Sequence, residues 1–269
     1  VDEVWHHAAH ASAVAAEYPL PGNWLVFAWD GVGLGEDGTL WGGEALYGSA
    51  AQWRRAATLR SFRLPGGDRA GREPWRSAAA LHWECGLSFD GRADRGGLAE
   101  AAWRQRLNTP ETTAAGRLFD AAAALVCGLQ HVSFEAQGPM QLESLCRQPG
   151  AVIELPLNAD DSGLLRSDWQ PLLGMLCDAS LDRVARAESF HSSMATALWR
   201  QAATVREQQR VDQVGLCGGV FQNRVLTEQV TALLAADGFD VYVPELLPCN
   251  DAAISFGQAA HVAARPVEA

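Results

Sequence analysis

Short apolar runs along the chain are bounded by proline, glycine and acidic residues, and longer stretches with helical spacing of apolar residues lie between them. The short runs predict strands at residues 24–30, 59–67 and 151–157. The segment Glu36-Asp37-Gly38 predicts a tight hairpin turn after the first strand. The longer stretches predict helices at residues 6–18, 74–86, 98–107, 112–129, 138–148, 168–178 and 181–209.

Residues 211–244 carry the most informative pattern. A strand, a turn at Gly218-Gly219, an amphipathic helix and a second strand follow one another there, and a further helix closes the chain. This order is typical of a parallel β-α-β unit whose turn faces a nucleotide. The pattern therefore predicts an α/β fold.

Composition narrows the classes of function. The 269 residues are 48% hydrophobic, which is enough to bury the core of one two-lobed domain or of two small domains. The formal net charge of -11 offers no surface for neutralising phosphates, so we expect no nucleic-acid partner. No apolar run reaches membrane-spanning length, no N-terminal signal pattern occurs and no CxxC pair is present. These features predict a cytoplasmic protein without a membrane anchor or zinc finger.

Two histidines and two distant aspartates form a candidate metal site. His6 and His10 are four residues apart on a predicted helix, so their imidazoles project from one face, although a solvated first turn is an equal alternative. Asp30 ends an apolar strand at a glycine-rich stretch, and Asp251 precedes the last helix, where either could simply cap or turn the chain. Together, two imidazoles and two carboxylates suit ferrous iron, zinc or manganese.

A second group of residues is a candidate nucleotide site. The backbone of Gly218 and Gly219, between a strand and a helix N-terminus, would allow a phosphate or nucleoside to approach closely, with Asn223 as a polar contact. Asp120 and Glu143, on two predicted helices, would reach the hydroxyls of a ribose. The alternatives are an ordinary Gly-Gly turn and solvated acidic helix faces.

Seven segments in order resemble the HypF family of hydrogenase maturation proteins. VWHHAAHASAVAAEY resembles the family's VQHHHAH segment, and FAWDGVGLGEDGTLWGGEAL resembles its DG-G-G-DGT-WGGE stretch. The other five are LPGGDRAGREPWR, NTPETTAAGRLFDAAAAL, FEAQGPMQLESL, LCGGVFQNRVLTE and LPCNDAAISFGQA. The resemblance covers essentially the whole chain.

The resemblance implies a two-lobed actin/Hsp70/sugar-kinase type fold without the first strands of its N-terminal lobe. Residues 1–110 would form the remainder of that lobe and residues 111–269 the nucleotide-binding lobe. It implies transfer of carbamoyl from carbamoyl-adenylate, made from ATP and carbamoyl phosphate, to the C-terminal cysteine of HypE. A divalent metal, Fe²⁺ or Zn²⁺, would be held by the residues that match the family's ligands, which are His6, His10, Asp30 and Asp251. Asp30 and Asp251 would also lie at the carbamoyl site and act in catalysis. The nucleotide would contact Gly116, Asp120, Glu143, Gly218, Gly219 and Asn223.

The sequence also departs from the family pattern. The family's central histidine is Ala8 here, the glutamine before the histidines is Trp5, and the NDGG segment ends in Ala252 and Ala253. The acylphosphatase-like, zinc-binding and YrdC-like parts of the family have no counterpart in this sequence. These departures predict a fragment or a degenerate paralogue. They keep two alternatives open, an O-carbamoyltransferase with a small-molecule acceptor and a catalytically inactive docking module.

Overall fold

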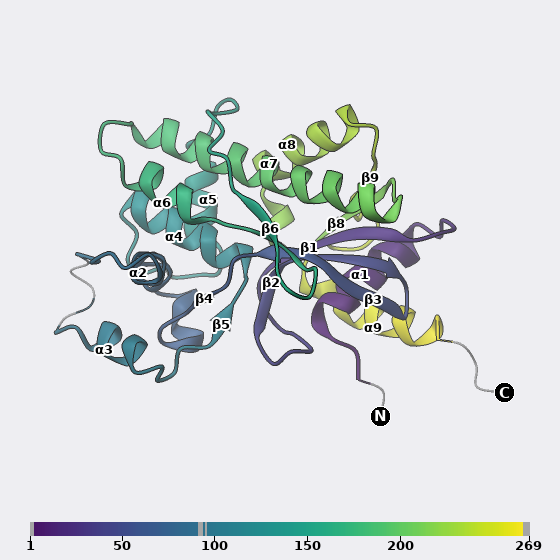
Figure 1. The fold of residues 1–269 in the computed structure, drawn as a ribbon, viewed down its shortest axis with the longest axis horizontal. Coiled ribbons are helices and arrows are strands. Elements are labelled where there is room, and N and C mark those ends of the chain that lie inside the picture. The colour runs from purple at the N-terminus through teal and green to yellow at the C-terminus, as the bar shows by residue number, and fades with distance from the viewer. Residues whose placement is uncertain (1–2, 91–93, 95, 266–269) are drawn as a thin grey trace.

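The computed structural model of the chain describes residues 3–90, 94 and 96–265, and within these it shows an α/β fold built on one mixed sheet (Figure 1). The strands are β1 (Trp24–Leu34), β2 (Leu40–Ser49), β3 (Gln52–Leu59), β4 (Phe62–Arg63), β5 (Glu111–Thr112), β6 (Leu157–Ala159), β7 (Leu165–Ser167), β8 (Gln213–Cys217) and β9 (Asp240–Tyr242). Their main order across the sheet is β6-β7-β3-β2-β1-β8-β9, with β5 pairing with both β2 and β4. The antiparallel hairpin β1-β2 is thus joined to the parallel pair β8-β9 through β1.

Helices cover both faces of this sheet. The α-helices are α1 (His6–Glu17), α2 (Trp75–Glu84), α3 (Leu98–Arg104), α4 (Ala115–Cys127), α5 (Gln137–Glu143), α6 (Gln170–Cys177), α7 (Arg183–Gln209), α8 (Arg224–Ala236) and α9 (Ile254–Ala263), and short 3-10 turns are η1 (Gly67–Gly71), η2 (Gly219–Gln222) and η3 (Asp251–Ala253). In Figure 1, α4, α7 and α8 lie on one side of the sheet, and α1 and α9 lie side by side on the other.

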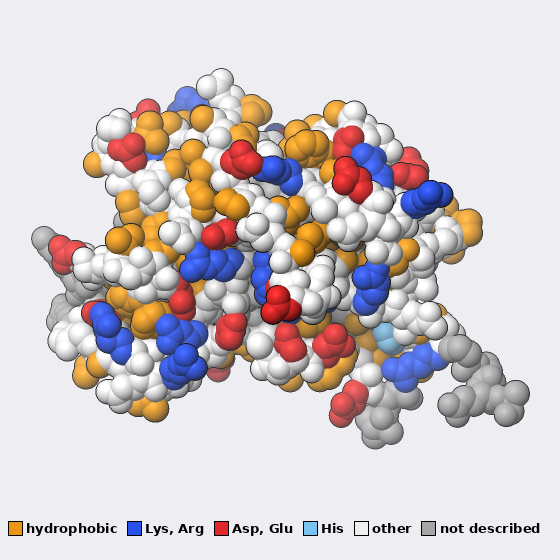
Figure 2. All heavy atoms as spheres, in the orientation of Figure 1, with side chains coloured by type: hydrophobic (Ala, Val, Ile, Leu, Met, Phe, Trp, Pro, Cys, Tyr) orange, Lys and Arg blue, Asp and Glu red, His pale blue; other side chains and the backbone are white. Residues whose placement is uncertain are grey.

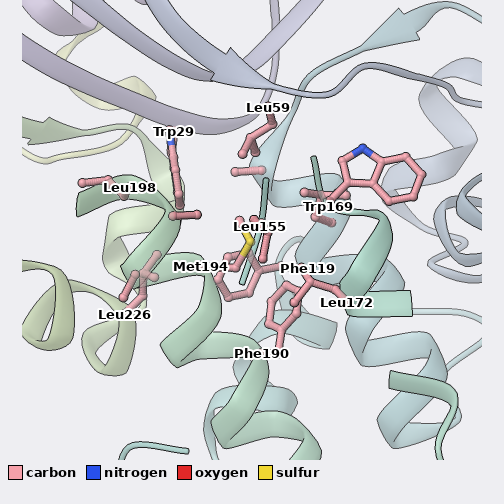
Figure 3. Close-up of a cluster of buried hydrophobic side chains, with 14 of the residues drawn as sticks. Trp29, Leu59, Phe119, Leu155, Trp169, Leu172, Phe190, Met194, Leu198 and Leu226 are labelled. Carbon is pink, nitrogen blue, oxygen red and sulfur yellow. The ribbon is translucent and has the colours of Figure 1, made fainter. Parts of the chain in front are cut away.

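Strand β1 is the centre of the core because both of its faces are covered. Residues 24–29 are all buried, which is the pattern of a strand packed on two sides. Phe27 and Trp29 face the larger core, and Val26 faces α1. Figure 3 shows part of the larger core, where Phe119 from α4 and Leu226 from α8 approach the sheet.

Most of the predicted helices are confirmed, with local signals that explain their ends. Helix α4 ends at Gly128, whose φ of 73° is the left-handed conformation that glycine adopts without strain. Helix α7 begins after Asp182, whose side chain accepts a hydrogen bond from the amide of Ala185 at 2.7 Å. The predicted helix at residues 112–129 begins later than expected because Thr112 belongs to β5.

Two predicted strands are wrong. The strand expected at residues 59–67 lies earlier, as β3, and only the two residues of β4 follow it before Pro65 and Gly66 turn the chain. Residues 151–156 form no strand, because this segment packs along α7 and bonds to one of its hydroxyl groups. The amide of Ile153, for example, donates to Ser193 Oγ at 2.8 Å.

The charged surface is mixed, with arginine and acidic side chains lying among apolar ones on the face shown in Figure 2. Among the described residues, no helix combines the length and apolar character needed to cross a bilayer.

Candidate metal and nucleotide site

Helix α1 presents His6 and His10 on one face, one turn apart. The alanine-rich sequence of this helix lets it lie close to the sheet and to α9, and Ala9, Ala11 and Ala13 are all buried. The closest approach is to α9, where a Cβ added at Gly257 would lie far inside van der Waals contact with the carbonyl oxygen of Ala9. The helix is therefore held in a defined position relative to the start of α9.

Asp30 reaches the two histidines from β1. Its pairing with β2 shifts register between Trp29 and Gly33, which is where a bulge re-aims side chains. Asp30 Oδ2 lies 3.2 Å from Nε2 of His6 and 3.2 Å from Nε2 of His10. Its other oxygen, Oδ1, accepts a hydrogen bond of 2.7 Å from the amide of Gly31, which fixes the orientation of the carboxylate.

Asp251 completes the group from the first residue of η3. Its Oδ1 lies 3.5 Å from His6 Nε2 and 3.3 Å from His10 Nε2. One donor atom from each of the four side chains lies within 4.8 Å of the others. Neighbouring donor atoms of a tetrahedral site with metal-ligand distances of about 2.0–2.2 Å are about 3.3–3.6 Å apart. The imidazole-carboxylate distances thus fit a single divalent ion such as Fe²⁺ or Zn²⁺.

The electrostatics of the site favour an ionised Asp30 facing the imidazoles. Burial raises the pKa of Asp30, but hydrogen bonds with His10 and His6 outweigh burial and hold the pKa well below its ordinary value. Burial lowers the pKa of His10, yet its contacts with Asp251 and Asp30 raise it overall. The His10 side chain is 1% exposed and that of Asp251 is 68% exposed, so one side of the group opens to solvent.

His7 is fully buried, and its ring lies edge-on to that of His6 with 5.0 Å between the centroids. Neither of its ring nitrogens has a hydrogen-bond partner, and its ring centroid lies 6.0 Å from that of Trp41. Burial lowers its pKa well below the ordinary value, so the ring is neutral. Nothing in the local sequence distinguishes the buried His7 from its neighbour His6.

Glycines bring other segments close to the backbone of Asp30. A Cβ at Gly116 would lie 3.0 Å from the carbonyl oxygen of Asp30 and 2.8 Å from Gly31 Cα, so glycine lets the start of α4 approach β1. Gly219 in turn allows η2 to approach the side chain of Asp30, since a Cβ there would lie 3.1 Å from Asp30 Oδ1. Gly218 has a φ of 94°, and its amide donates to the carbonyl of Cys249 at 2.6 Å. That amide is therefore already paired within the protein.

Asn223 and Glu143, two of the residues expected at the nucleotide, meet at the N-terminus of α8. Asn223 Oδ1 accepts from the amide of Leu226 at 2.9 Å, and its Nδ2 lies 2.9 Å from His191 Nε2. Glu143 Oε1 accepts from the amide of Arg224 at 2.7 Å. Both side chains therefore pair with groups that a helix start leaves free.

Asp120 lies one turn into α4 and is almost fully buried, with an exposed fraction of 3%. Its Oδ2 is 2.9 Å from Nη1 of Arg117, although without the alignment of a hydrogen bond. Burial raises the pKa of Asp120 to about 6, against a smaller lowering by the charge of Arg117. The sequence left open that Asp120 is an ordinary solvated residue on a helix face. Its burial and raised pKa contradict that alternative.

The raised pKa predicts that Asp120 destabilises the fold as pH rises. Between an ordinary pKa of 3.8 and about 6 the folded state holds a proton that the unfolded state has lost, so stability falls with pH in this window and is constant above it. We expect the wild type to lose about 1 kcal/mol of unfolding free energy relative to Asp120→Asn between about pH 5 and about pH 7. Urea unfolding of both proteins across this range measures the difference. A difference that does not change with pH would contradict the buried, titrating carboxylate.

Arg117, the partner of Asp120, is a further charged residue on α4. It lies in the first turn of α4, and its side chain is 13% exposed. A cation near a helix N-terminus is disfavoured by the helix dipole, and this placement was the signal available in the sequence.

Comparison with known proteins identifies similar chains. The family model described as "Carbamoyltransferase, Kae1-like Domain, second subdomain" matches residues 26–258. The chain is 38% identical to a "Carbamoyltransferase HypF homolog" of Cupriavidus necator, over 99% of this chain and 72% of that protein. It is 37% identical to "Carbamoyltransferase HypF" of Rhizobium leguminosarum, over 96% of this chain but only 34% of the relative.

Two solved structures share the fold. Full-length HypF in its phosphate- and nucleotide-bound form superimposes with a TM-score of 0.86 at 29% sequence identity, covering 97% of this chain and 36% of that one. HypF of T. kodakarensis gives a TM-score of 0.82 at 27% identity, covering 96% of this chain and 36% of that one. The chain thus spans about a third of the length of both solved proteins.

Proposed function

Because the chain belongs to the HypF carbamoyltransferase family, we propose that it transfers a carbamoyl group from carbamoyl-adenylate to the C-terminal cysteine of a HypE-type acceptor protein. The observation that carries this proposal is the convergence of His6, His10, Asp30 and Asp251, which come from three separate parts of the chain. The start of α4 packs against Asp30, so a nucleotide on α4 would place its phosphate beside this group.

The proposed architecture is the two-lobed actin/Hsp70/sugar-kinase type. Residues 1–110 would contribute to the first lobe and residues 111–269 would form the nucleotide-binding lobe. The pairing of β1 with β8 supports this arrangement, because it brings the glycine turn after β8 next to Asp30. In such α/β folds ligands bind beyond the carboxyl ends of parallel strands.

In the proposed reaction the acceptor thiolate attacks the carbamoyl carbon of carbamoyl-adenylate. The bond between that carbon and the phosphate oxygen breaks, AMP leaves with the electron pair, and the thiol proton passes to solvent. His6, His10, Asp30 and Asp251 would hold Fe²⁺ or Zn²⁺, whose charge would stabilise the developing oxyanion. The orientation of Asp30 by the Gly31 amide keeps its Oδ2 directed at both histidines. ATP and carbamoyl phosphate would supply the adenylate.

The nucleoside part would lie along α4 and the glycine turn. Gly116 and Gly219 leave the space next to Asp30 free of side chains. Asp120 would accept from a ribose hydroxyl, and Gly218, Asn223 and Glu143 would shape the far end of this surface by holding η2 and α8 in place.

The test is transfer to an acceptor protein. The chain is incubated with a HypE-type protein and carbamoyl-adenylate generated in place from ATP and carbamoyl phosphate by a YrdC-like domain, and the acceptor is examined by intact-mass spectrometry. We expect the mass of one carbamoyl group on the acceptor, and none on an acceptor whose C-terminal cysteine is replaced by serine. Stable binding of the acceptor without transfer would instead indicate the docking module, and transfer only to small hydroxyl compounds would indicate an O-carbamoyltransferase.

The two alanines that replace the family's glycines do not strain η3. Ala252 is exposed, and its amide donates to Asn250 Oδ1 at 3.1 Å. Neither Ala252 nor Ala253 has a positive φ. The backbone that carries Asp251 therefore accommodates alanine, which favours the transferase over the inactive module.

A further inference from the structure

We propose that Arg117 is a further substrate-binding residue, whose guanidinium holds the phosphate of the nucleotide beside Asp30. The inference rests on the proposed function, because it assigns the anion to the adenylate. Arg117 belongs neither to the four candidate metal ligands nor to the six candidate nucleotide residues.

The position of Arg117 places its guanidinium between two glycine-bearing segments next to the metal group. Its Nη2 lies 3.1 Å from where a Cβ at Gly31 would be, and Gly31 directly follows Asp30. Its Nη1 lies 3.3 Å from where a Cβ at Gly71 would be, at the end of η1. The guanidinium thus lies against bare backbone on both sides, and a side chain at either glycine would contact it.

The hydrogen-bonding capacity of this guanidinium is not used up within the protein. Arginine offers five N–H donors. Among the described residues, the ion pair of Arg117 is the one with Asp120 Oδ2, and its Nε is buried without a hydrogen-bond partner. Because a buried charged group with unmet donors is costly, a ligand with several acceptor oxygens would stabilise this arrangement.

The local charges favour an anion in the same place. Helix α4 is 13 residues long, has no acidic residue in its first turn and has no side chain capping its N-terminus. The free amides and the dipole of the helix therefore add to the charge of Arg117 rather than neutralising it. Asp120 is the one carboxylate paired with this guanidinium among the described residues, and its Oδ2 lies against Nη1 alone, which leaves Nε and Nη2 for an anion.

A phosphate fits these features better than an uncharged group does. The planar fork of a guanidinium matches two phosphate oxygens, and such charge-assisted bonds are among the stronger ones in proteins. In the proposed reaction the same contact would gain strength as AMP leaves, because negative charge accumulates on the phosphate oxygen when the carbamoyl bond breaks.

The test compares binding of AMP with binding of adenosine, which lacks the phosphate, to the 269-residue chain by isothermal titration calorimetry. We expect Arg117→Gln to weaken AMP binding about 10- to 100-fold. Adenosine binding should be unchanged. Arg117→Lys, which keeps the charge and the pair with Asp120 but loses the fork, should weaken AMP by a smaller factor, and it serves as the measurement if the glutamine variant does not fold.

Arg76 provides a matched control. Its side chain is 12% exposed and pairs with Glu73 three residues away at 2.6 Å, much as Arg117 pairs with Asp120. Arg76→Gln should leave the affinities for both AMP and adenosine unchanged. This comparison separates the loss of a buried ion pair from the loss of a phosphate contact.

The outcomes distinguish this inference from the proposed function. If the wild type binds AMP and adenosine and Arg117→Gln alters both by the same factor, or neither, Arg117 is a structural partner of Asp120 and only this inference fails. If the wild type binds neither compound, the adenylate-dependent function and the assignment of Arg117 fail together.

Discussion

Asp30→Asn is expected to weaken divalent-metal binding by at least about 100-fold, the largest effect of any single substitution in the site. The reason is geometric, because Asp30 Oδ2 lies 3.2 Å from both histidine nitrogens and its side chain is only 13% exposed. Asparagine has nearly the same shape as aspartate, so this substitution should preserve the packing around residue 30 while it removes the negative charge. Titration of the metal-free protein with Zn²⁺ measures the change in affinity. Metal analysis of anaerobically purified wild type and variant compares their bound metal.

The same experiment ranks the other ligands and includes a control. Asp251→Asn should have a smaller effect than Asp30→Asn, because the side chain of Asp251 is 68% exposed and water can replace it. Asp240→Asn, in which an exposed carboxylate on β9 is removed, should leave the affinity unchanged. Equal affinity of Asp30→Asn and wild type would mean that the four side chains do not form a metal site.

Gly257→Ala is expected to destabilise the protein by about 1–3 kcal/mol through overpacking. The added methyl group would overlap the carbonyl oxygen of Ala9 and force α9 away from α1. Because η3 leads directly into α9, this displacement should also move Asp251 away from the histidines and lower metal affinity. Urea unfolding and the same Zn²⁺ titration measure the two effects.

Gly174→Ala is the control for helix propensity. Gly174 also lies within a helix, α6, but a Cβ there would meet nothing within 4 Å. Alanine should therefore stabilise the protein by about 0.5–1 kcal/mol, the usual advantage over glycine inside a helix. If Gly257→Ala were as stable as Gly174→Ala, the close contact between α1 and α9 would not hold Asp251 in place.

Three of the four candidate metal ligands, His6, His10 and Asp30, were predictable from local pattern. Helical spacing is enough to place His6 and His10 on one face, and an apolar run ending in Asp30 is enough to place that carboxylate at the end of a buried strand. The position of Asp251 beside these three residues was not predictable, because it depends on α9 packing against α1 through Gly257. No periodicity along the chain encodes that contact.

The two wrong strands have separate physical causes. An apolar run shows that a segment is buried but not what its backbone bonds to. At residues 151–156 the side-chain hydroxyl of Ser193 on α7 accepts from the amide of Ile153, where a strand would use a neighbouring strand. At β3, Arg54 and Arg55 in the first half of the strand concealed the buried apolar end that follows them.

The sequence by itself determined the α/β class, most of the helices, the family through the order of its motifs, and the identity of the four candidate metal ligands. Only the tertiary structure decided that these ligands meet, that Asn223 and Glu143 bond to the start of α8, and that Arg117 lies against Gly31. The reason is that helices and turns depend on neighbouring residues, whose pattern is legible along the chain. Contacts across β1, α4 and α9 depend on strand order and helix packing, which join residues more than eighty positions apart.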